Sequence, residues 1–356
     1  MSSAARYELL MNTDFVRGLH EGLAAASERI CIQVMTFDGD AAGLGVSELL
    51  IDAAERGVDV RLTVDVFAFR YVSDVKVNSP LVADEVAETH AMFDRMEAAG
   101  VAVTYISPWG PLLMFGPFRN HKKVYVIDDV AYIGGINISD HNFEWLDFNI
   151  GFTEPSMVAA VVDDFEKTRA GERQALRGPI ITNEHVEATF LELIEQATES
   201  VVVASPYALD VDLVKRLAAV SAGEKVVVAP RRNNFRMFRA TDPYIRARLS
   251  RQGVELRTYT DFFHAKFALI DGTKLLVGSS NFGRHSFRCN QEIAVVIEDQ
   301  DFITSFKSVL DRTEVHAETA SPVQYAVGSL AAYFMYLGTM FIEKVFARHA
   351  PTLTSR

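Results

Sequence analysis

Residues 121–128 read HKKVYVID and residues 264–271 read HAKFALID, so the pattern His-x-Lys-x-x-x-x-Asp occurs twice in these 356 residues. A Gly-rich stretch ending in Asn follows each copy: GGIN, ending at Asn137, and GSSN, ending at Asn281. Two copies with nearly the same internal spacing make coincidence improbable. We therefore expect the chain to fold its two half-sites face to face into one active site.

Each copy predicts a β-hairpin with polar groups at its open end. The His and the Lys are two residues apart, so on a strand both side chains leave the same face. The four residues before each Asp are apolar and β-prone, and Asp-Asp or Asp-Gly then signals a turn. Folding the chain about these turns places Asn137 opposite His121 and Asn281 opposite His264. Asp128 lies at an odd offset from its His, so we expect a structural role for it.

The residue types suit attack on a phosphodiester. The predicted catalytic groups are His121, Lys123, Asn137, His264, Lys266 and Asn281, with Asp271 structural like its counterpart. One imidazole can form a covalent intermediate while the other transfers protons. Lysines and amides can bind the non-bridging oxygens, the task that a metal performs elsewhere. The sequence shows no metal-ligand cluster, so we predict no metal and no cofactor.

The paired motifs resemble those of the phospholipase D superfamily, most closely its bacterial cardiolipin synthase branch. After the first motif, Trp145 and Asp147 occupy places like those of a Trp and an Asp in that branch. After the second, Arg288, Asn290 and Glu292 form a similar run. The resemblance covers roughly residues 5 to 310.

The resemblance also implies roles for residues that spacing alone does not assign. Each catalytic His needs a partner on its second nitrogen that fixes the tautomer. The implied partners are Asp147 for His121 and Glu292 for His264. The two halves are quasi-symmetric, so the residues leave the identity of the nucleophile open, and the resemblance favours His121.

Alternating strands and helices repeat in the same order in both halves, which predicts an α/β fold. We expect two homologous α/β sandwich domains in a pseudo-twofold arrangement, with one active site at their interface and an apolar C-terminal helix. The expected boundaries are 1–175, 176–316 and 317–356.

Two surfaces are candidates for binding substrate or membrane. Seven arginines lie between residues 231 and 251, interleaved with aromatic residues. They form either a solvated helix face or a rim that attracts anionic headgroups. An apolar loop just before the first motif would form the matching lip. The predicted contact residues are Trp109, Phe115, Phe118, Arg231, Arg232, Arg236 and Arg239.

Residues 321–342 carry no charge and are long enough to span a bilayer, which needs about 20 residues. The flanking charges do not favour a cytoplasmic catalytic domain, because the basic residues lie beyond the segment. Spanning, shallow insertion, and packing on the domain or on a second subunit all remain open.

Composition reduces the number of functions that are compatible with the sequence. A net charge of −12 argues against bulk nucleic-acid binding. Two cysteines make no disulfide framework, and the N-terminus lacks a signal-peptide pattern, so we expect a cytoplasmic, membrane-associated enzyme. The leading function is a phosphatidyltransferase that acts on phospholipids, with phosphatidylglycerol as one candidate substrate. The alternatives are a phospholipid hydrolase, then a nuclease, and last a binding module. The oligomeric state is left open.

Overall fold

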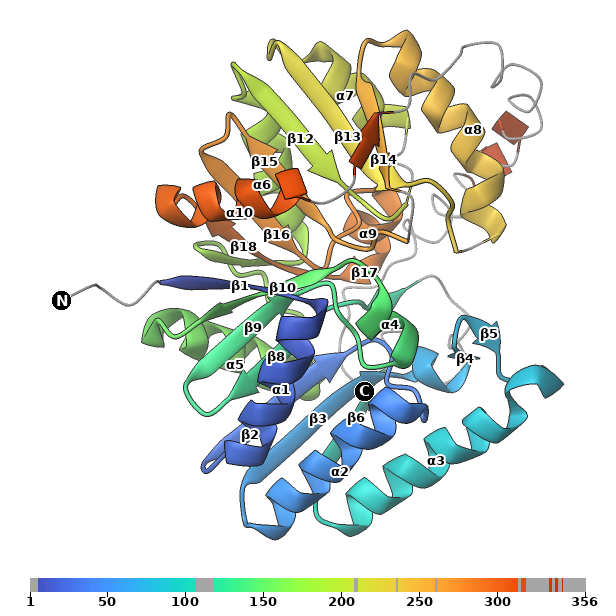
Figure 1. Cartoon of the computed structure of the whole chain (residues 1–356), viewed down its shortest axis with the longest axis vertical. Helices are drawn as coiled ribbons and strands as arrows, with labels where there is room; N and C mark the ends of the chain where they lie inside the picture. The colour runs from blue at the N-terminus through green and yellow to red at the C-terminus, as the bar shows by residue number, and fades with distance from the viewer. Residues whose placement is uncertain are drawn as a thin grey trace.

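Two β-sheets, each with helices, make up the chain (Figure 1). The computed structural model describes residues 6–106, 118–207, 211–234, 236–259, 262–312, 315–317, 333–334, 337–338 and 341. The prediction of two α/β halves is confirmed. The expected boundary at 175/176 falls between the last helix of the first half, which ends at Arg169, and the first strand of the second half, which begins at Ile180.

The strands of the two sheets follow the same spatial order. The first sheet runs β1 (Tyr7–Met11), β10 (Phe148–Phe152), β9 (Val130–Gly134), β8 (Val124–Ile127), β2 (Arg29–Val34), β3 (Asp59–Asp65) and β6 (Ala102–Ile106). The second runs β11 (Ile180–Thr182), β18 (Ile293–Ile297), β16 (Lys274–Gly278), β15 (Phe267–Ile270), β12 (Ser200–Ala204), β13 (Glu224–Pro230), β14 (Glu255–Tyr259) and β19 (Val315–Ala317). Matching positions have matching chain order, as a duplicated architecture requires.

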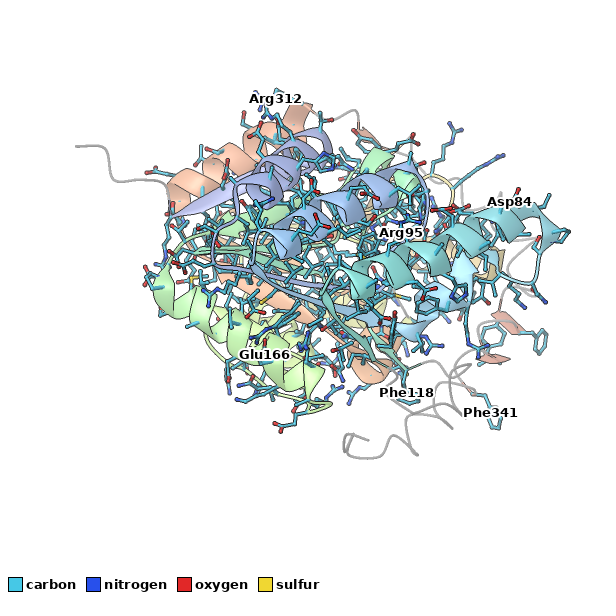
Figure 2. All side chains as sticks on the ribbon, turned by 90° about the horizontal axis from the view of Figure 1, so that it is seen from below. Asp84, Arg95, Phe118, Glu166, Arg312 and Phe341 are labelled. Carbon is cyan, nitrogen blue, oxygen red and sulfur yellow. The ribbon has the colours of Figure 1, made fainter. Side chains whose placement is uncertain are left out.

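The helices also correspond between the halves. The first half contains α1 (Asn12–Ala25), α2 (Ala41–Glu55), α3 (Ala83–Ala98), α4 (Asp140–Glu144) and α5 (Pro155–Arg169), with short 3₁₀ turns at Val66–Phe69 and Pro80–Val82. The second contains α6 (Glu184–Glu195), α7 (Val211–Ala219), α8 (Arg236–Arg251), α9 (Arg284–Cys289) and α10 (Gln300–Arg312). Figure 2 shows α5, marked by Glu166, on the opposite side of the first sheet from α3, marked by Asp84 and Arg95.

A shared apolar core joins the two sheets. It takes residues from both halves, and outer cores lie under the remaining helices of each half. Phe306 of α10 contacts Phe148 of β10 and Phe267 of β15, with ring centroids 5.4 and 5.1 Å apart. Burying such rings stabilises the fold by about 1.5–3 kcal/mol each. Separating the halves would expose this core, so they form one unit.

The motif hairpins form as predicted, with a shift of one residue. Val124 pairs with Ile133, and Phe267 pairs with Val277. Continuing these registers places residues 136 and 280 opposite the two histidines, one residue before each Asn. The strands β9 and β16 have already ended at Gly134 and Gly278, so the asparagines lie in the following loops.

The aspartates of the two motifs have matching geometry. Asp128 and Asp271 both adopt left-handed backbone conformations, with φ of 48° and 50°. The Asp128 carboxylate accepts backbone N–H bonds from Ser27, Glu28 and Arg29 at 2.8–3.1 Å. Asp271 does the same at the start of β12. These bonds fasten the hairpin turns to the preceding helix–strand junctions, which agrees with the structural role their spacing predicts.

The predicted apolar C-terminal segment, residues 321–342, lies mostly outside the described residues. Of this segment, the described residues are all exposed: Tyr333, Phe334, Leu337, Gly338 and Phe341. No helix within the described ranges is long and apolar enough to cross a membrane.

Candidate active site

The reactive side chains of both motifs are buried at the junction of the two halves. His121 and Lys123 lie just before β8, and His264 and Lys266 lie just before β15. The histidines are 8% and 5% exposed, and the lysines 0% and 1%. The charges of both lysines lower the pKa of each histidine, so groups from the two halves share one electrostatic environment.

Backbone pairing between the halves brings the motifs together. Strand β7 (Arg119–Asn120) pairs in parallel with β17 (Asn290–Gln291). The His121 N–H then donates to the Gln291 carbonyl at 2.9 Å. In the other half, the His264 N–H donates to the Leu146 carbonyl at 2.8 Å. Each histidine therefore lies beside the segment that carries the acidic residue of the opposite half.

The histidine partners are the reverse of those we expected from resemblance. His264 Nδ1 lies 2.7 Å from Asp147 Oδ2, and His121 Nδ1 lies 3.0 Å from Glu292 Oε1. The predicted pairs, Asp147 with His121 and Glu292 with His264, are wrong. The physical reason is the pairing between halves, which places each carboxylate next to the histidine of the other motif. Both acids nevertheless belong to the site.

Close packing at Gly135 makes room for Asp147. A Cβ atom at Gly135 would lie 2.2 Å from Asp147 Oδ2, which is too close for any residue other than glycine unless Asp147 moved. The equivalent position in the second half is Ser279, whose hydroxyl donates to Glu292. At this position the second half has a hydroxyl that bonds its carboxylate, whereas the first half has no side chain.

The Glu292 carboxylate is held by several donors. Besides His121, it accepts from the hydroxyls of Ser279 and Ser286 and from Asn290 Nδ2 at 3.2 Å. Burial alone would raise its pKa, but His121, Lys123 and these bonds bring the pKa of Glu292 down to about 2. Our sequence reasoning missed both serines, although the GSSN stretch and the short helix after it were visible signals.

The protonation of the site follows from burial and charge. Burial and, to a smaller extent, the charge of Lys266 lower the pKa of His264 to about 3, although Asp147 opposes this change. Burial also lowers the pKa of Lys123 to about 7 and that of Lys266 to about 8. Both imidazoles are therefore neutral at neutral pH, and the two lysines can lose their charge in the same range. An ionised carboxylate only accepts, so a hydrogen bond from His264 to Asp147 requires the proton on Nδ1, an atom that also lies 2.9 Å from Lys266 Nζ.

The lysines and asparagines lie beside the histidines with constrained side chains. Lys123 Nζ donates to the His121 carbonyl at 2.7 Å, and Lys266 Nζ bonds the His264 carbonyl in the same way. Asn137 Oδ1 accepts the Met35 N–H at 3.2 Å, and Asn137 Nδ2 donates one hydrogen to Asn142 Oδ1 at 3.4 Å, which leaves the second hydrogen for another acceptor. Asn281 Oδ1 is buried and accepts no hydrogen bond from the described residues.

Aromatic rings border His264. The ring of Trp145 lies 5.1 Å from the His264 ring, and the ring of Phe262 lies 4.4 Å from that of Trp145.

Behind the first motif, Lys122 is fully buried and pairs with Asp164 of α5 at 2.7 Å. This ion pair fastens the motif strand from its opposite face, and its spacing in the sequence gave no sign of it.

The predicted membrane-contact residues have different outcomes. Phe118 is only 3% exposed, so its prediction as a contact residue is wrong: it packs inside the protein. Trp109 and Phe115 lie outside the described residues, as does the side chain of Arg236. The remaining three, Arg231, Arg232 and Arg239, are exposed. Their role stays a prediction.

Comparison with known proteins identifies the family. The family model "Cardiolipin synthase, PLD-like domain" matches residues 19–169 and 190–313. Cardiolipin synthase A of Pseudomonas aeruginosa is 25% identical over 341 residues, covering 86% of this chain and 66% of that protein. A probable cardiolipin synthase of Bacillus subtilis is 23% identical over 342 residues, covering 86% and 65%. The chain thus spans just under two thirds of the length of these relatives.

Solved structures share the fold. Phosphatidylserine synthase of Haemophilus influenzae superposes with a TM-score of 0.72 at 13% identity, covering 98% of this chain and 95% of that one. Polyphosphate kinase of Porphyromonas gingivalis gives 0.59 at 12% identity, covering 95% and 56%. At such identities the likeness establishes the fold alone. Because the family model covers most of the chain, the protein belongs to the phospholipase D superfamily, in its cardiolipin synthase branch.

Proposed function

We propose that this protein transfers a phosphatidyl group from one phospholipid to the hydroxyl of a second lipid or alcohol, through a phosphohistidine. The observation that carries the proposal is the pair of buried histidines, each bonded through Nδ1 to a carboxylate of the opposite half. This arrangement leaves each Nε2 for chemistry. The family membership supports a phospholipid as the substrate.

His121 is the proposed nucleophile, in keeping with the family resemblance. Its neutral ring attacks phosphorus through Nε2, and the bond from phosphorus to the leaving alcohol oxygen breaks. Glu292 accepts the Nδ1 proton in a hydrogen bond and stabilises the positive charge that develops on the ring. The incoming alcohol then attacks phosphorus from the opposite side and releases His121.

His264 transfers the protons in this proposal. It protonates the leaving oxygen and later removes the proton of the incoming hydroxyl. Before substrate binds, the His264 ring is neutral, because burial and Lys266 lower its pKa to about 3. An anionic phosphodiester entering between Lys123 and Lys266 would offset their charges and raise that pKa. Asp147 holds the proton-carrying form in place.

The lysines and asparagines take the role of phosphate ligands. Two ammonium groups and two amides can bind the non-bridging oxygens, so the reacting atoms need no metal. Turnover of a phosphodiester is therefore expected to continue in EDTA. A fall of turnover in EDTA to the background level of His121→Ala would contradict this part of the mechanism.

Hydrolysis of phospholipids is the second candidate, since it differs only in whether water replaces the alcohol. We favour transfer because both histidines are almost fully buried and His264 adjoins Trp145, an apolar side chain that limits access of water. A nuclease is a weaker candidate, because the net charge of −12 opposes binding of polyanions. We further propose that the protein acts at the cytoplasmic membrane surface.

The test is an incubation with phosphatidylglycerol vesicles, with and without added glycerol, followed by lipid analysis. Transfer predicts a diphosphatidyl lipid and free glycerol, and excess glycerol should drive the reaction backwards. Hydrolysis predicts phosphatidic acid under both conditions. His121→Ala serves as the matched control for adventitious lipase activity. No change in any lipid relative to this variant would refute the proposal.

A further inference from the structure

A second polar cluster lies beside the active site, where the loop after β2 meets the start of α4. Asp38, Asp40 and His141 each place one potential ligand atom within 4.8 Å of the others. These residues come from FDGD at 37–40 and SDH at 139–141, about 100 residues apart, so the sequence gave no metal-ligand spacing. We propose that the three residues form a binding site for one divalent cation.

Asp40 has a structural role that is compatible with this one. Its Oδ1 accepts the Gly43 N–H at 3.0 Å and so caps α2, and its Oδ2 accepts the Asp140 N–H at 2.7 Å. Each of these bonds uses one lone pair of an oxygen that has two. The cap explains why an Asp stands at position 40, and it leaves the carboxylate able to bind a cation.

The carboxylate of Asp38 has no such explanation. The residue is 1% exposed, and its Oδ2 accepts the Ser73 N–H at 3.2 Å. Its Oδ1 is also buried, and no described group bonds it. Buried polar atoms are nearly always satisfied, and a buried carboxylate without a partner is costly. A cation between Asp38, Asp40 and His141 would supply the missing partner.

The surroundings favour positive charge. Asp40, Glu85 and Asp74 all raise the pKa of Asp38, in addition to the larger effect of its burial. Carboxylates likewise surround His141, where Asp140 and Glu144 join them. No lysine or arginine is among the groups resolved as acting on either residue. The three residues therefore lie in a concentration of negative charge that a bound cation would offset.

The ligand types indicate which cation fits. Two carboxylate oxygens and one imidazole nitrogen suit Mn²⁺ or Zn²⁺ better than Mg²⁺ or Ca²⁺, which prefer oxygen alone. His141 Nδ1 lies 3.1 Å from Ser139 Oγ, a partner that can orient the ring while Nε2 binds the metal. Asn142 Nδ2, now 2.9 Å from Nε2, would have to turn away.

The cation would link three loops and border the catalytic centre without touching the reacting atoms. Asp38 is bonded to the loop between β4 (Tyr71–Val72) and β5 (Val75–Lys76) through Ser73. The ring of His141 lies 4.5 Å from that of Trp145, which in turn contacts His264. A bound cation would fix His141 and, through it, Trp145. This inference does not depend on the proposed lipid reaction.

Cation binding by the full-length protein is the direct test. After dialysis against a chelator, the protein is titrated with Mn²⁺, and free Mn²⁺ is measured by electron paramagnetic resonance. One saturable site per chain is expected, together with competition by Zn²⁺ and a cation-dependent rise in melting temperature. Absence of saturable binding up to about 1 mM would overturn the proposal.

Two variants and a matched control locate the site. Asp38→Asn should weaken Mn²⁺ binding by at least about tenfold and abolish the rise in melting temperature. Its metal-free form should be no less stable than the parent, because it removes a buried ionisable group. His141→Ala provides an independent loss of one ligand. Glu144→Gln removes an exposed neighbouring charge and should retain binding within about twofold. Parental affinity in Asp38→Asn and His141→Ala, or an equal loss in all three variants, would refute this ligand set.

Discussion

Replacing Asp147 by Asn tests the pairing of each histidine with the acid of the opposite half. The variant preserves the shape of the side chain but removes the charge that lies 2.7 Å from His264 Nδ1 and 3.5 Å from Lys266 Nζ. It also allows an amide N–H to face the imidazole, which favours the wrong tautomer. His121 keeps its bond to Glu292.

The expected loss of activity follows from these contacts. A hydrogen bond to a charged group contributes about 1.5–3 kcal/mol, and the loss of the correct tautomer adds to this. In serine proteases, the equivalent Asp-to-Asn change lowers kcat by about 10⁴. We therefore expect a decrease of about 10³–10⁴ in kcat, or roughly 4–5.5 kcal/mol. Turnover of a short-chain, water-soluble phosphodiester measures this without the complication of vesicle binding.

Imidazole NMR distinguishes the observed pairing from the one that the sequence suggested. With ¹⁵N-labelled histidine, the hydrogen-bonded Nδ1–H signal of His264 should disappear or shift in Asp147→Asn, while that of His121 remains. Glu292→Gln should give the opposite result. Each signal is assigned from its absence in the variant that lacks that histidine, His121→Ala or His264→Ala. Loss of the His121 signal in Asp147→Asn would refute the structural argument.

Four further outcomes follow from the site and its supports. His121→Ala and His264→Ala should each abolish turnover with unchanged circular dichroism, whereas substantial activity in either variant would contradict a shared site. The pH profile of kcat/KM should fall on the alkaline side from about pH 7 to 8 as Lys123 and Lys266 lose their protons, because burial lowers their pKa values to about 7 and about 8; a flat profile up to pH 10 would contradict this. The folded-state pKa of His264 is about 3, below its usual 6.5, so as pH falls the unfolded chain binds this proton before the folded chain does. The contribution of the neutral His264 ring to the free energy of unfolding should therefore be lost as pH falls from about 6.5 towards 3. Urea titrations measure this loss, which His264→Ala should lack. Lys122→Met leaves Asp164 buried without its partner and should lower the free energy of unfolding by about 3–5 kcal/mol, whereas the added change Asp164→Leu should restore most of it.

The local sequence was sufficient to predict the two motif hairpins and the polar side chains that they bring together. His121 and Lys123 are separated by the period of a strand, and the apolar run after them forms β8 because it is buried on both faces. The duplication also predicted matching halves, and both sheets have the same strand order. These features depend on interactions between residues that are near one another in the chain, and such interactions can be predicted from periodicity and turn residues.

Contacts between residues more than 100 positions apart in the chain were decided by packing alone. The sequence contained Asp147 and Glu292 but could not assign them, because the choice depends on the pairing of β7 with β17 and on the contact of His264 with Leu146. The same holds for Asp38 and His141, which meet only when the loop after β2 reaches α4. Spacing along a chain fixes which face a side chain takes, whereas partners across an interface are fixed by how two folded surfaces fit. In this protein the sequence determined the polar groups of the two motifs, and the tertiary structure determined which acid bonds each histidine.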